Sequence, residues 1–248
     1  MCLIAFAWRP SHSQPLIVAA NRDEFYARPT RPLSRWEDAP QVCAGRDLEA
    51  GGTWMGIGAQ GRFAAVTNIR DPGQPTGLRS RGELVAKFLK GEQSPEGYVT
   101  EIAARAGEYT GFNLLVGDAG RLYYLNSAAP VPQLLTEGVY GLSNALLNTP
   151  WPKLLRARAA LYAQLEFPSS EALLNLLHDP QPAAEAELPD TGVGLATESL
   201  LSSIFIASPN YGTRASTVLI VNADGGSQMI EHSFGPHGGR LGEVELKV

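Results

Sequence analysis

Short apolar runs separated by turn residues occupy both ends of the chain. The first two, Cys2–Trp8 and residues 16–20, flank a segment with turn residues at each of its ends, which predicts an N-terminal β-hairpin. Similar apolar, β-branched or aromatic runs predict further strands, most of them joined by Gly, Asp or Asn turns at hairpin spacing. These runs cover residues 41–44, 53–58, 63–68, 112–117, 122–126, 133–136, 139–143, 216–223, 227–234 and 241–247. The sheets are therefore expected to be largely antiparallel.

Helical periodicity is confined to the middle of the chain. Apolar residues recur three and four positions apart in four segments, which cover residues 81–90, 95–106, 152–165 and 169–178. Ser80 and Ser169 occupy N-cap positions, and Glu83 predicts a full capping box for the first of these helices. Strands at both chain ends enclose these helices instead of alternating with them. The pattern therefore favours a layered α+β sandwich over a doubly wound sheet.

The length of the chain, 248 residues, suits one domain. Layered domains of roughly 200–250 residues are routine. The Pro/Ala/Glu-rich residues 180–189 are expected to form an exposed loop and not a linker, because strands are predicted beyond them. We therefore expect a single domain spanning residues 1–248.

Charge and cysteine content narrow the functional class. The net charge is −5, and the 20 basic and 25 acidic residues are spread along the chain, which favours a small organic ligand over nucleic acid or anionic lipid. Cys2 and Cys43 lack disulfide or zinc-ligand spacing and fit a reducing compartment. The N-terminal apolar run has no positive n-region, and no run approaches the roughly 18 apolar residues of a membrane helix. We expect a cytoplasmic protein without stable membrane insertion.

Gly56, Gly58 and Gly61 have the spacing of a dinucleotide-binding fingerprint. That motif requires a strand that leads into a helix, whereas residues 63–67 continue as a strand. The sequence predicts a glycine-rich hairpin turn here.

Cys2 is the candidate nucleophile because of its position. Removal of the initiator Met would leave a thiol and a free α-amine on the same residue. The α-amine has a pKa of roughly 7.7–8.0 and the thiol one of about 8.5, so the amine can accept the thiol proton near neutral pH. The alternative is a buried apolar cysteine at the start of an edge strand.

Four consecutive polar residues, Asn21-Arg22-Asp23-Glu24, end the strand that is predicted to pair with the strand of Cys2. Strand alternation directs Arg22 and Glu24 to one face and the other two to the opposite face. An arginine near a thiol favours the thiolate, and a nearby carboxylate can hold an ammonium group. This cluster favours the catalytic interpretation of Cys2.

Six motifs span nearly the whole chain. They are Met1-Cys2-Leu3-Ile4, Asn21-Arg22-Asp23-Glu24, Gly51-Gly52-Thr53-Trp54, Thr67-Asn68, Gly141-Leu142-Ser143-Asn144 and Tyr211-Gly212-Thr213-Arg214. Together and in this order they resemble the NRDE family, also called the transport and Golgi organisation 2 family.

That family is similar to the N-terminal nucleophile (Ntn) hydrolases, with bile-salt hydrolases and penicillin V acylases as the comparison. The resemblance implies a four-layer αββα sandwich, with Cys2 as the nucleophile and Asn144 as a donor to the oxyanion. The implied catalytic residues are Cys2, Arg22, Asp23 and Asn144, and the implied substrate-binding residues are Asn21, Asn68 and Arg214.

The leading hypothesis is cysteine-dependent hydrolysis of an amide or thioester of a small organic or acyl substrate, without a cofactor or metal. The alternative is a non-catalytic carrier of haem or an acyl lipid, because eukaryotic relatives are associated with haem trafficking and lipid homeostasis. A third hypothesis, an interaction module of a secretory or membrane-organising pathway, has only the family name in its favour.

Overall fold

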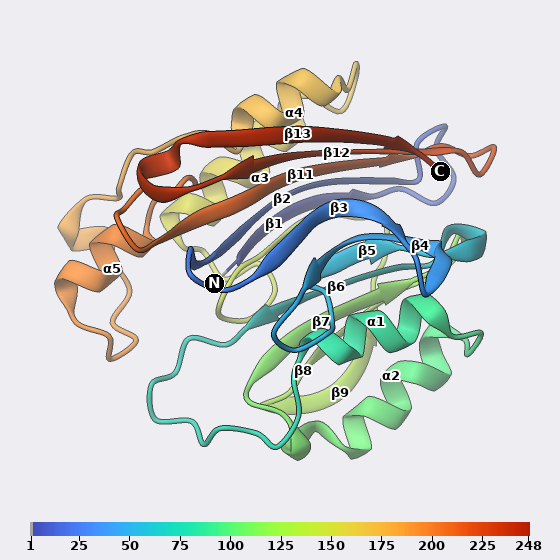
Figure 1. Cartoon of the computed structure of the whole chain (residues 1–248), viewed down its shortest axis with the longest axis horizontal. Helices are drawn as coiled ribbons and strands as arrows, with labels where there is room; N and C mark the ends of the chain where they lie inside the picture. Colours follow the sequence, from blue (N-terminus) through green and yellow to red (C-terminus); the bar gives the residue numbers. More distant parts are fainter. Residues whose placement is uncertain (1) are drawn as a thin grey trace.

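Two antiparallel β-sheets lie face to face in the computed structural model, which describes residues 2–248 (Figure 1). The strands of the first sheet are β1 (Cys2–Trp8), β2 (Leu16–Phe25), β10 (Gly138–Leu142), β11 (Tyr211–Val221), β12 (Ser227–Phe234) and β13 (Arg240–Lys247). Those of the second are β3 (Thr30–Trp36), β4 (Ala39–Asp47), β5 (Met55–Ile57), β6 (Phe63–Asn68), β7 (Phe112–Gly117), β8 (Leu122–Asn126) and β9 (Ala129–Leu134). Met1, with which the first motif begins, lies outside the described residues.

The strand order in the first sheet is β10-β1-β2-β11-β12-β13, and the second sheet follows the chain from β3 to β9. Helices α3 (Pro152–Ala163) and α4 (Ser170–Leu176) pack on the outer face of the first sheet. Helices α1 (Gly82–Lys90) and α2 (Pro95–Ala104) pack on the outer face of the second, and α5 (Leu195–Leu201) lies at one end of the first sheet (Figure 1). The layers confirm the expected α+β fold, a four-layer αββα sandwich.

Both faces of β1 are buried, which explains its continuous apolar sequence. Phe6 and its even-numbered neighbours face the second sheet and join Val18 in the core between the sheets. Leu3 and the small Ala5 face the helices and pack against residues such as Leu161. Side chains of β1 therefore alternate between two hydrophobic cores. This alternation fixes the face of the sheet on which each side chain lies, back to Cys2 at the start of the strand.

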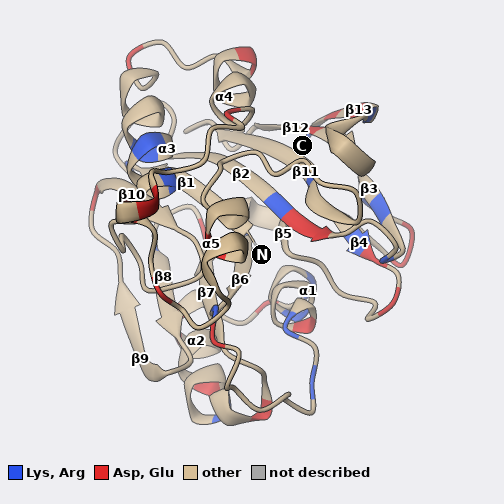
Figure 2. Ribbon diagram, turned by 90° about the vertical axis from the view of Figure 1, so that its left-hand side faces the viewer, with Lys and Arg blue, Asp and Glu red and all other residues tan. Residues whose placement is uncertain are grey.

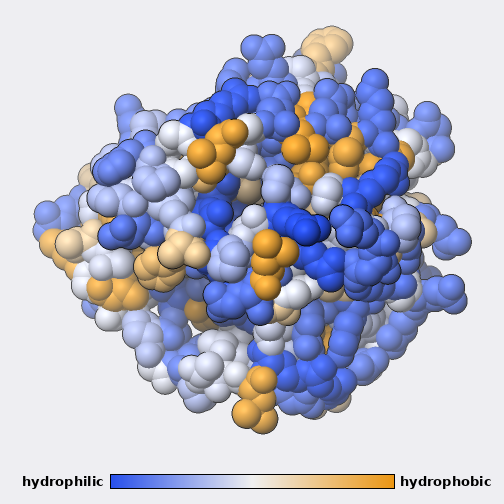
Figure 3. Space-filling model, in the orientation of Figure 1, coloured by the Kyte–Doolittle hydropathy of each residue, from blue (hydrophilic) through white to orange (hydrophobic). Residues whose placement is uncertain are grey.

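The surface that Figure 3 shows is mostly hydrophilic, and hydrophobic side chains appear on it in small separate groups. Leu78, Val131 and Phe167 are the most exposed of the large hydrophobic residues. Most of the apolar side chains lie in the three cores.

The N-terminal hairpin forms as predicted, with Cys2 opposite Arg22. The four predicted helices are present within a few residues, and Gly58 and Gly61 flank a short turn between the antiparallel strands β5 and β6. Ser169 caps α4 by accepting a hydrogen bond from the backbone N–H of Ala172 at 3.1 Å. These elements were readable from local pattern alone.

Four features differ from the sequence-based expectation. Strand β3 and helix α5 were not predicted, and β2 continues through the polar motif to Phe25. The capping box at α1 does not form, because the Glu83 carboxylate accepts hydrogen bonds from Arg79 and Tyr109, both at 2.6 Å.

One buried carboxyl group joins the two sheets. Glu231 of β12 accepts a hydrogen bond from the backbone N–H of Leu33 in β3 at 2.7 Å, and another from the Thr217 hydroxyl at 3.2 Å. Burial raises the pKa of Glu231 to about 7, although both hydrogen bonds favour the ionised form. Near neutral pH this carboxyl group is therefore balanced between its neutral and charged forms.

The raised pKa of Glu231 makes stability depend on pH. An unfolded Glu titrates near pH 4.3, so the folded protein binds the extra proton between about pH 4.3 and 7 and loses stability as pH rises through that window. Above pH 7 the loss of unfolding free energy from this group reaches about 4 kcal/mol. We predict that the free energy of unfolding of Glu231→Gln, measured in urea, rises relative to that of the parent protein as the pH increases from 5 to 8. An equal difference in unfolding free energy at both pH values would contradict this assignment.

Candidate active site

Cys2 lies at the start of β1, an inner strand between β10 and β2. It lines a cavity of about 150 Å³ at the end of the sandwich, together with residues from the end of β2, the 53–54 segment, the end of β6 and the start of α1. Figure 2 views this end of the molecule, where basic and acidic segments adjoin at the end of β2 near the point marked N. Burial raises the pKa of the Cys2 thiol and nearby Asp23 raises it further, whereas Arg22 lowers it. The thiol therefore needs an adjacent base to become a thiolate at neutral pH.

Arg22 and Trp54 form one wall of this cavity. The Arg22 guanidinium carbon lies 4.4 Å from the centroid of the Trp54 ring, and its Nη2 is 3.8 Å from Glu24 Oε2. Only 6% of Arg22 is exposed. The cation–π contact therefore replaces much of the water that this cation would bind, and it joins the second motif of the sequence to the third.

Asp23 projects toward the helical layer beside the same cavity. It is 1% exposed and accepts a hydrogen bond from the Thr213 hydroxyl at 2.8 Å. Burial raises the pKa of its carboxyl group, and the positive charge of Lys153 opposes that shift most strongly. Asp23 is thus a carboxylate whose ionisation depends on nearby cations.

A buried set of charges behind Cys2 was missed by sequence reasoning. Lys153, in the first turn of α3, is 1% exposed, and burial lowers the pKa of its amine to about 8 while Asp23 opposes the shift. Its Nζ has no hydrogen-bond partner among residues 2–248. Arg70 forms a buried ion pair with Glu198 of α5 and stacks on Trp151 at 4.6 Å. Lys153, Arg70 and Glu198 come from segments distant in sequence. The sequence pattern around each of them is that of an ordinary helix or loop.

The end of β6 and the loop after β10 meet at Asn68 and Asn144. The Asn144 side-chain N–H group donates to the backbone oxygen and to Oδ1 of Asn68, both at 3.0 Å. The adjacent Ser143 hydroxyl donates to the carbonyl oxygen of Cys2 at 3.0 Å. Asn68 lines the cavity and Asn144 is linked to it through Asn68. To donate to an oxyanion, Asn144 must exchange one of its two bonds to Asn68.

Asn21 and Arg214 do not line the cavity at Cys2. Asn21 faces the helical layer, where its side chain donates to the carbonyl groups of Leu177 at 2.9 Å and Ile204 at 2.8 Å. Arg214 donates to three carbonyl oxygens at the end of β2 and in the turn after it, with the shortest bond to Arg28 at 2.6 Å. Both side chains thus hold backbone in place. Arg214 lines a neighbouring cavity of about 250 Å³ that shares Arg22 and Trp54 with the first.

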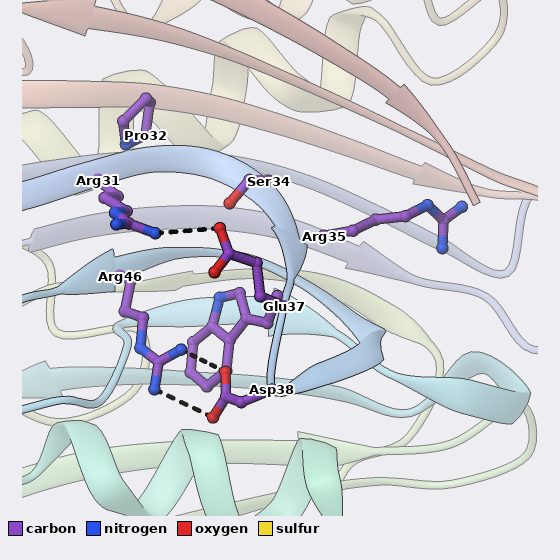
Figure 4. A pocket seen from close by; sticks show the side chains of 8 residues that line it. Arg31, Pro32, Ser34, Arg35, Glu37, Asp38 and Arg46 are labelled. Atoms are coloured by element: carbon purple, nitrogen blue, oxygen red, sulfur yellow. Dashed lines mark hydrogen bonds and ion pairs between the residues drawn. The ribbon is translucent and has the colours of Figure 1, made fainter.

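A larger hollow of about 560 Å³ lies over β3 and β4 (Figure 4). It shares no lining residue with the cavity at Cys2. Four of its charged side chains pair with one another, Arg31 with Glu37 at 3.6 Å and Arg46 with Asp38. The fifth, Arg35, donates to the carbonyl oxygen of Lys247 at 3.1 Å. This hollow holds no cysteine, so the cavity at Cys2 remains the candidate site.

No cluster of three or more His, Cys, Asp or Glu side chains suited to a metal ion occurs within residues 2–248. Over the same residues, the structure has no helix long and apolar enough to cross a membrane.

The protein is thus a four-layer αββα sandwich with a cysteine at the start of the inner strand β1. The family model described as Transport and Golgi organisation 2 matches residues 1–236, and the chain belongs to this family. The human transport and Golgi organization protein 2 homolog is 36% identical over 257 residues, which cover 94% of this chain and 93% of that protein. The Drosophila melanogaster transport and Golgi organization protein 2 is 29% identical over 273 residues, 96% and 95% of the two chains.

Among solved structures, the Caenorhabditis elegans N-acylethanolamine-hydrolyzing acid amidase ortholog matches with a TM-score of 0.47 and 11% sequence identity. The match covers 88% of this chain and 92% of that one.

Gly52 sets the position of Trp54 relative to α1. A Cβ at Gly52 would lie 2.4 Å from the carbonyl carbon of Gly82, and the Thr53 N–H donates to the Gly82 oxygen at 3.1 Å. We predict that Gly52→Ala forces this segment away from α1 and lowers the free energy of unfolding by about 1–3 kcal/mol in urea denaturation. Gly242→Ala is the matched control, because a Cβ there meets nothing within 4 Å. Equal stability of the two variants would contradict the close contact.

Proposed function

We propose that the protein is a cysteine Ntn hydrolase that cleaves an amide or thioester of a small organic or acyl substrate. The observation that carries the proposal is the position of Cys2, which opens into a cavity beside Arg22 and Asp23. The mechanism requires that Met1 is removed, so that Cys2 supplies both the thiol and the α-amine.

In the first half-reaction the α-amine of Cys2 accepts the thiol proton, and the thiolate attacks the substrate carbonyl carbon. A C–S bond forms and the carbonyl oxygen becomes an oxyanion. When the oxyanion collapses, the C–N or C–S bond of the substrate breaks, and the leaving group takes the proton from the ammonium. A thioester between Cys2 and the acyl group remains.

In the second half-reaction the amine accepts a proton from water as the water oxygen attacks the thioester carbonyl. The C–S bond breaks, the acid leaves, and the proton returns to the sulfur. An α-amine with a pKa of roughly 7.7–8.0 suits both transfers near neutral pH.

The surrounding groups support these steps electrostatically. The Arg22 cation lowers the pKa of the Cys2 thiol and so favours the attacking thiolate. The Asp23 carboxylate would hold the ammonium form of the amine, and Lys153 favours the ionised form of Asp23. Asn144 would supply an oxyanion donor once it exchanges a bond to Asn68, and such a donor contributes about 10²–10³ in rate.

The test begins with intact-mass measurement of purified protein, followed by reaction with a panel of small aryl amides and acyl thioesters. We predict hydrolysis and an acyl adduct on Cys2 in protein that lacks Met1. Cys2→Ala should lose both while its urea unfolding stays cooperative.

Cys43→Ala is the matched control, because Cys43 is fully buried between the sheets and does not line the cavity. Unchanged turnover in Cys2→Ala, or turnover by protein that retains Met1, would refute the proposal. Ligand binding without any turnover in the parent protein would instead favour the carrier hypothesis.

A further inference from the structure

The cavity at Cys2 has a polar lining whose charges are balanced in number. Its three basic residues and three acidic residues are Arg22, Arg28, Arg81, Asp23, Glu24 and Asp47. The pairing of these charges, and not their number, shows which one is available to a ligand.

Two of the three arginines already face carboxylates. Arg28 Nη2 lies 2.7 Å from Asp47 Oδ2, and its Nη1 lies 3.1 Å from Glu49 Oε1. Arg22 lies 3.8 Å from Glu24 and also stacks on Trp54. The charges of these two cations are therefore largely compensated inside the protein.

Arg81 differs from both. Among residues 2–248 no carboxylate lies within ion-pair distance of it, and its Nη1 donates to the carbonyl oxygen of Gly111 at 3.0 Å. It is half-buried, and burial lowers its pKa. The charges that oppose this shift are those of Cys2 first and Glu24 second, which places the guanidinium in the field of the nucleophile. An arginine keeps its charge in a protein. Among residues 2–248, the partly desolvated Arg81 guanidinium therefore has only a neutral partner, the carbonyl oxygen of Gly111.

The backbone beside Arg81 also contributes positive charge to the cavity. Ser80 and Gly82, which flank Arg81 at the start of α1, also line the cavity. The N-terminal end of a nine-residue helix carries partial positive charge, and it adds to the guanidinium charge on this side of the cavity. Gly52 holds this end of α1 against the segment that carries Trp54.

We propose that Arg81 determines substrate specificity by binding a carboxylate group on the molecule whose carbonyl carbon Cys2 attacks. The substrate class is then narrower than amides and thioesters in general. It is a small amide or thioester that also carries an ionised carboxylate group away from the reacting carbonyl. The guanidinium fork matches a carboxylate with two parallel hydrogen bonds. This inference rests on the proposed function for its chemistry, but its test requires only the Cys2 sulfur.

The experiment compares two alkylating reagents of nearly equal size, iodoacetate and iodoacetamide. Each forms an S–C bond to the Cys2 thiolate and releases iodide, and only iodoacetate carries a carboxylate. Second-order rate constants at Cys2 are measured by peptide mass spectrometry in a Cys43→Ala background, at an ionic strength of about 0.15 M, where charges beyond roughly 8 Å are screened.

We expect Arg81→Gln to lower the ratio of the iodoacetate rate to the iodoacetamide rate by about tenfold, which equals about 1.4 kcal/mol. A change in the pKa of the thiol alters both rates alike, so the ratio isolates recognition of the carboxylate. Arg121→Gln is the matched control for net charge, because Arg121 is exposed and outside the cavity. Its ratio should equal that of the parent protein.

A second measurement uses the parent protein and does not depend on the folding of a variant. Sodium acetate should slow the reaction of iodoacetamide with Cys2 at lower concentration than acetamide does. An unchanged reagent ratio in folded Arg81→Gln, equal protection by acetate and acetamide, or no reaction of Cys2 with either reagent would overturn the inference. If the parent protein hydrolyses no substrate but Arg81→Gln lowers the reagent ratio as expected, only the proposed function is refuted.

Discussion

The contact between the Arg22 guanidinium and the Trp54 indole connects the parts of the candidate site. Arg22 belongs to the first sheet, and Trp54 to the segment that enters the second sheet. A buried cation needs a partner that replaces water, and Trp54 is held in place by the close approach of Gly52 to α1 and of Gly45 to the indole ring. Cys2 lies opposite Arg22 in the strand register, so Cys2, the wall of its cavity and the start of α1 are positioned by one chain of contacts.

Behind this contact lies a second constraint, the burial of Asp23, Lys153, Arg70 and Glu198. Isolated buried charges are costly, and opposite charges lower that cost only when they approach one another. Helices α3 and α5 must therefore dock with their charged residues near the end of β2. The helical layer thus stabilises the charge state of the residues beside Cys2 as well as the hydrophobic core.

Local pattern was sufficient for most of the architecture. Apolar runs and turn residues identified the hairpin of Cys2, and periodicity identified four of the helices. The pattern failed for β3, where Pro32 and four charged or polar neighbours break the alternation. This strand is held by its edge position and by the hydrogen bond from Leu33 to Glu231. Helix α5 was missed although it is as long as α4, because it follows Gly194 and lacks the side-chain cap that Ser169 gives α4.

The candidate site was predictable only where its residues are close in sequence to a strand end. Alternation correctly separated Arg22 from Asn21, but it gave no sign that Asn21 binds the carbonyl groups of Leu177 and Ile204. Lys153 and Arg81 stand at ordinary helix positions, and only the packing of distant segments brings them to Cys2. Long-range hydrogen bonds and charge pairing have no signature in a single sequence.

The partition between the two cavities consists of side chains, those of Arg22 and Trp54, and not of backbone. Side chains can be exchanged or rotated without a change in strand register, whereas the sheets cannot move without loss of their hydrogen bonds. The depth of the cavity at Cys2 is therefore separable from the strand register that places the Cys2 sulfur, but not from the charge that Arg22 brings to it. Within this architecture, a substitution at Trp54 can lengthen the cavity at Cys2, whereas one at Arg22 changes both the room for a ligand and the charge beside the sulfur.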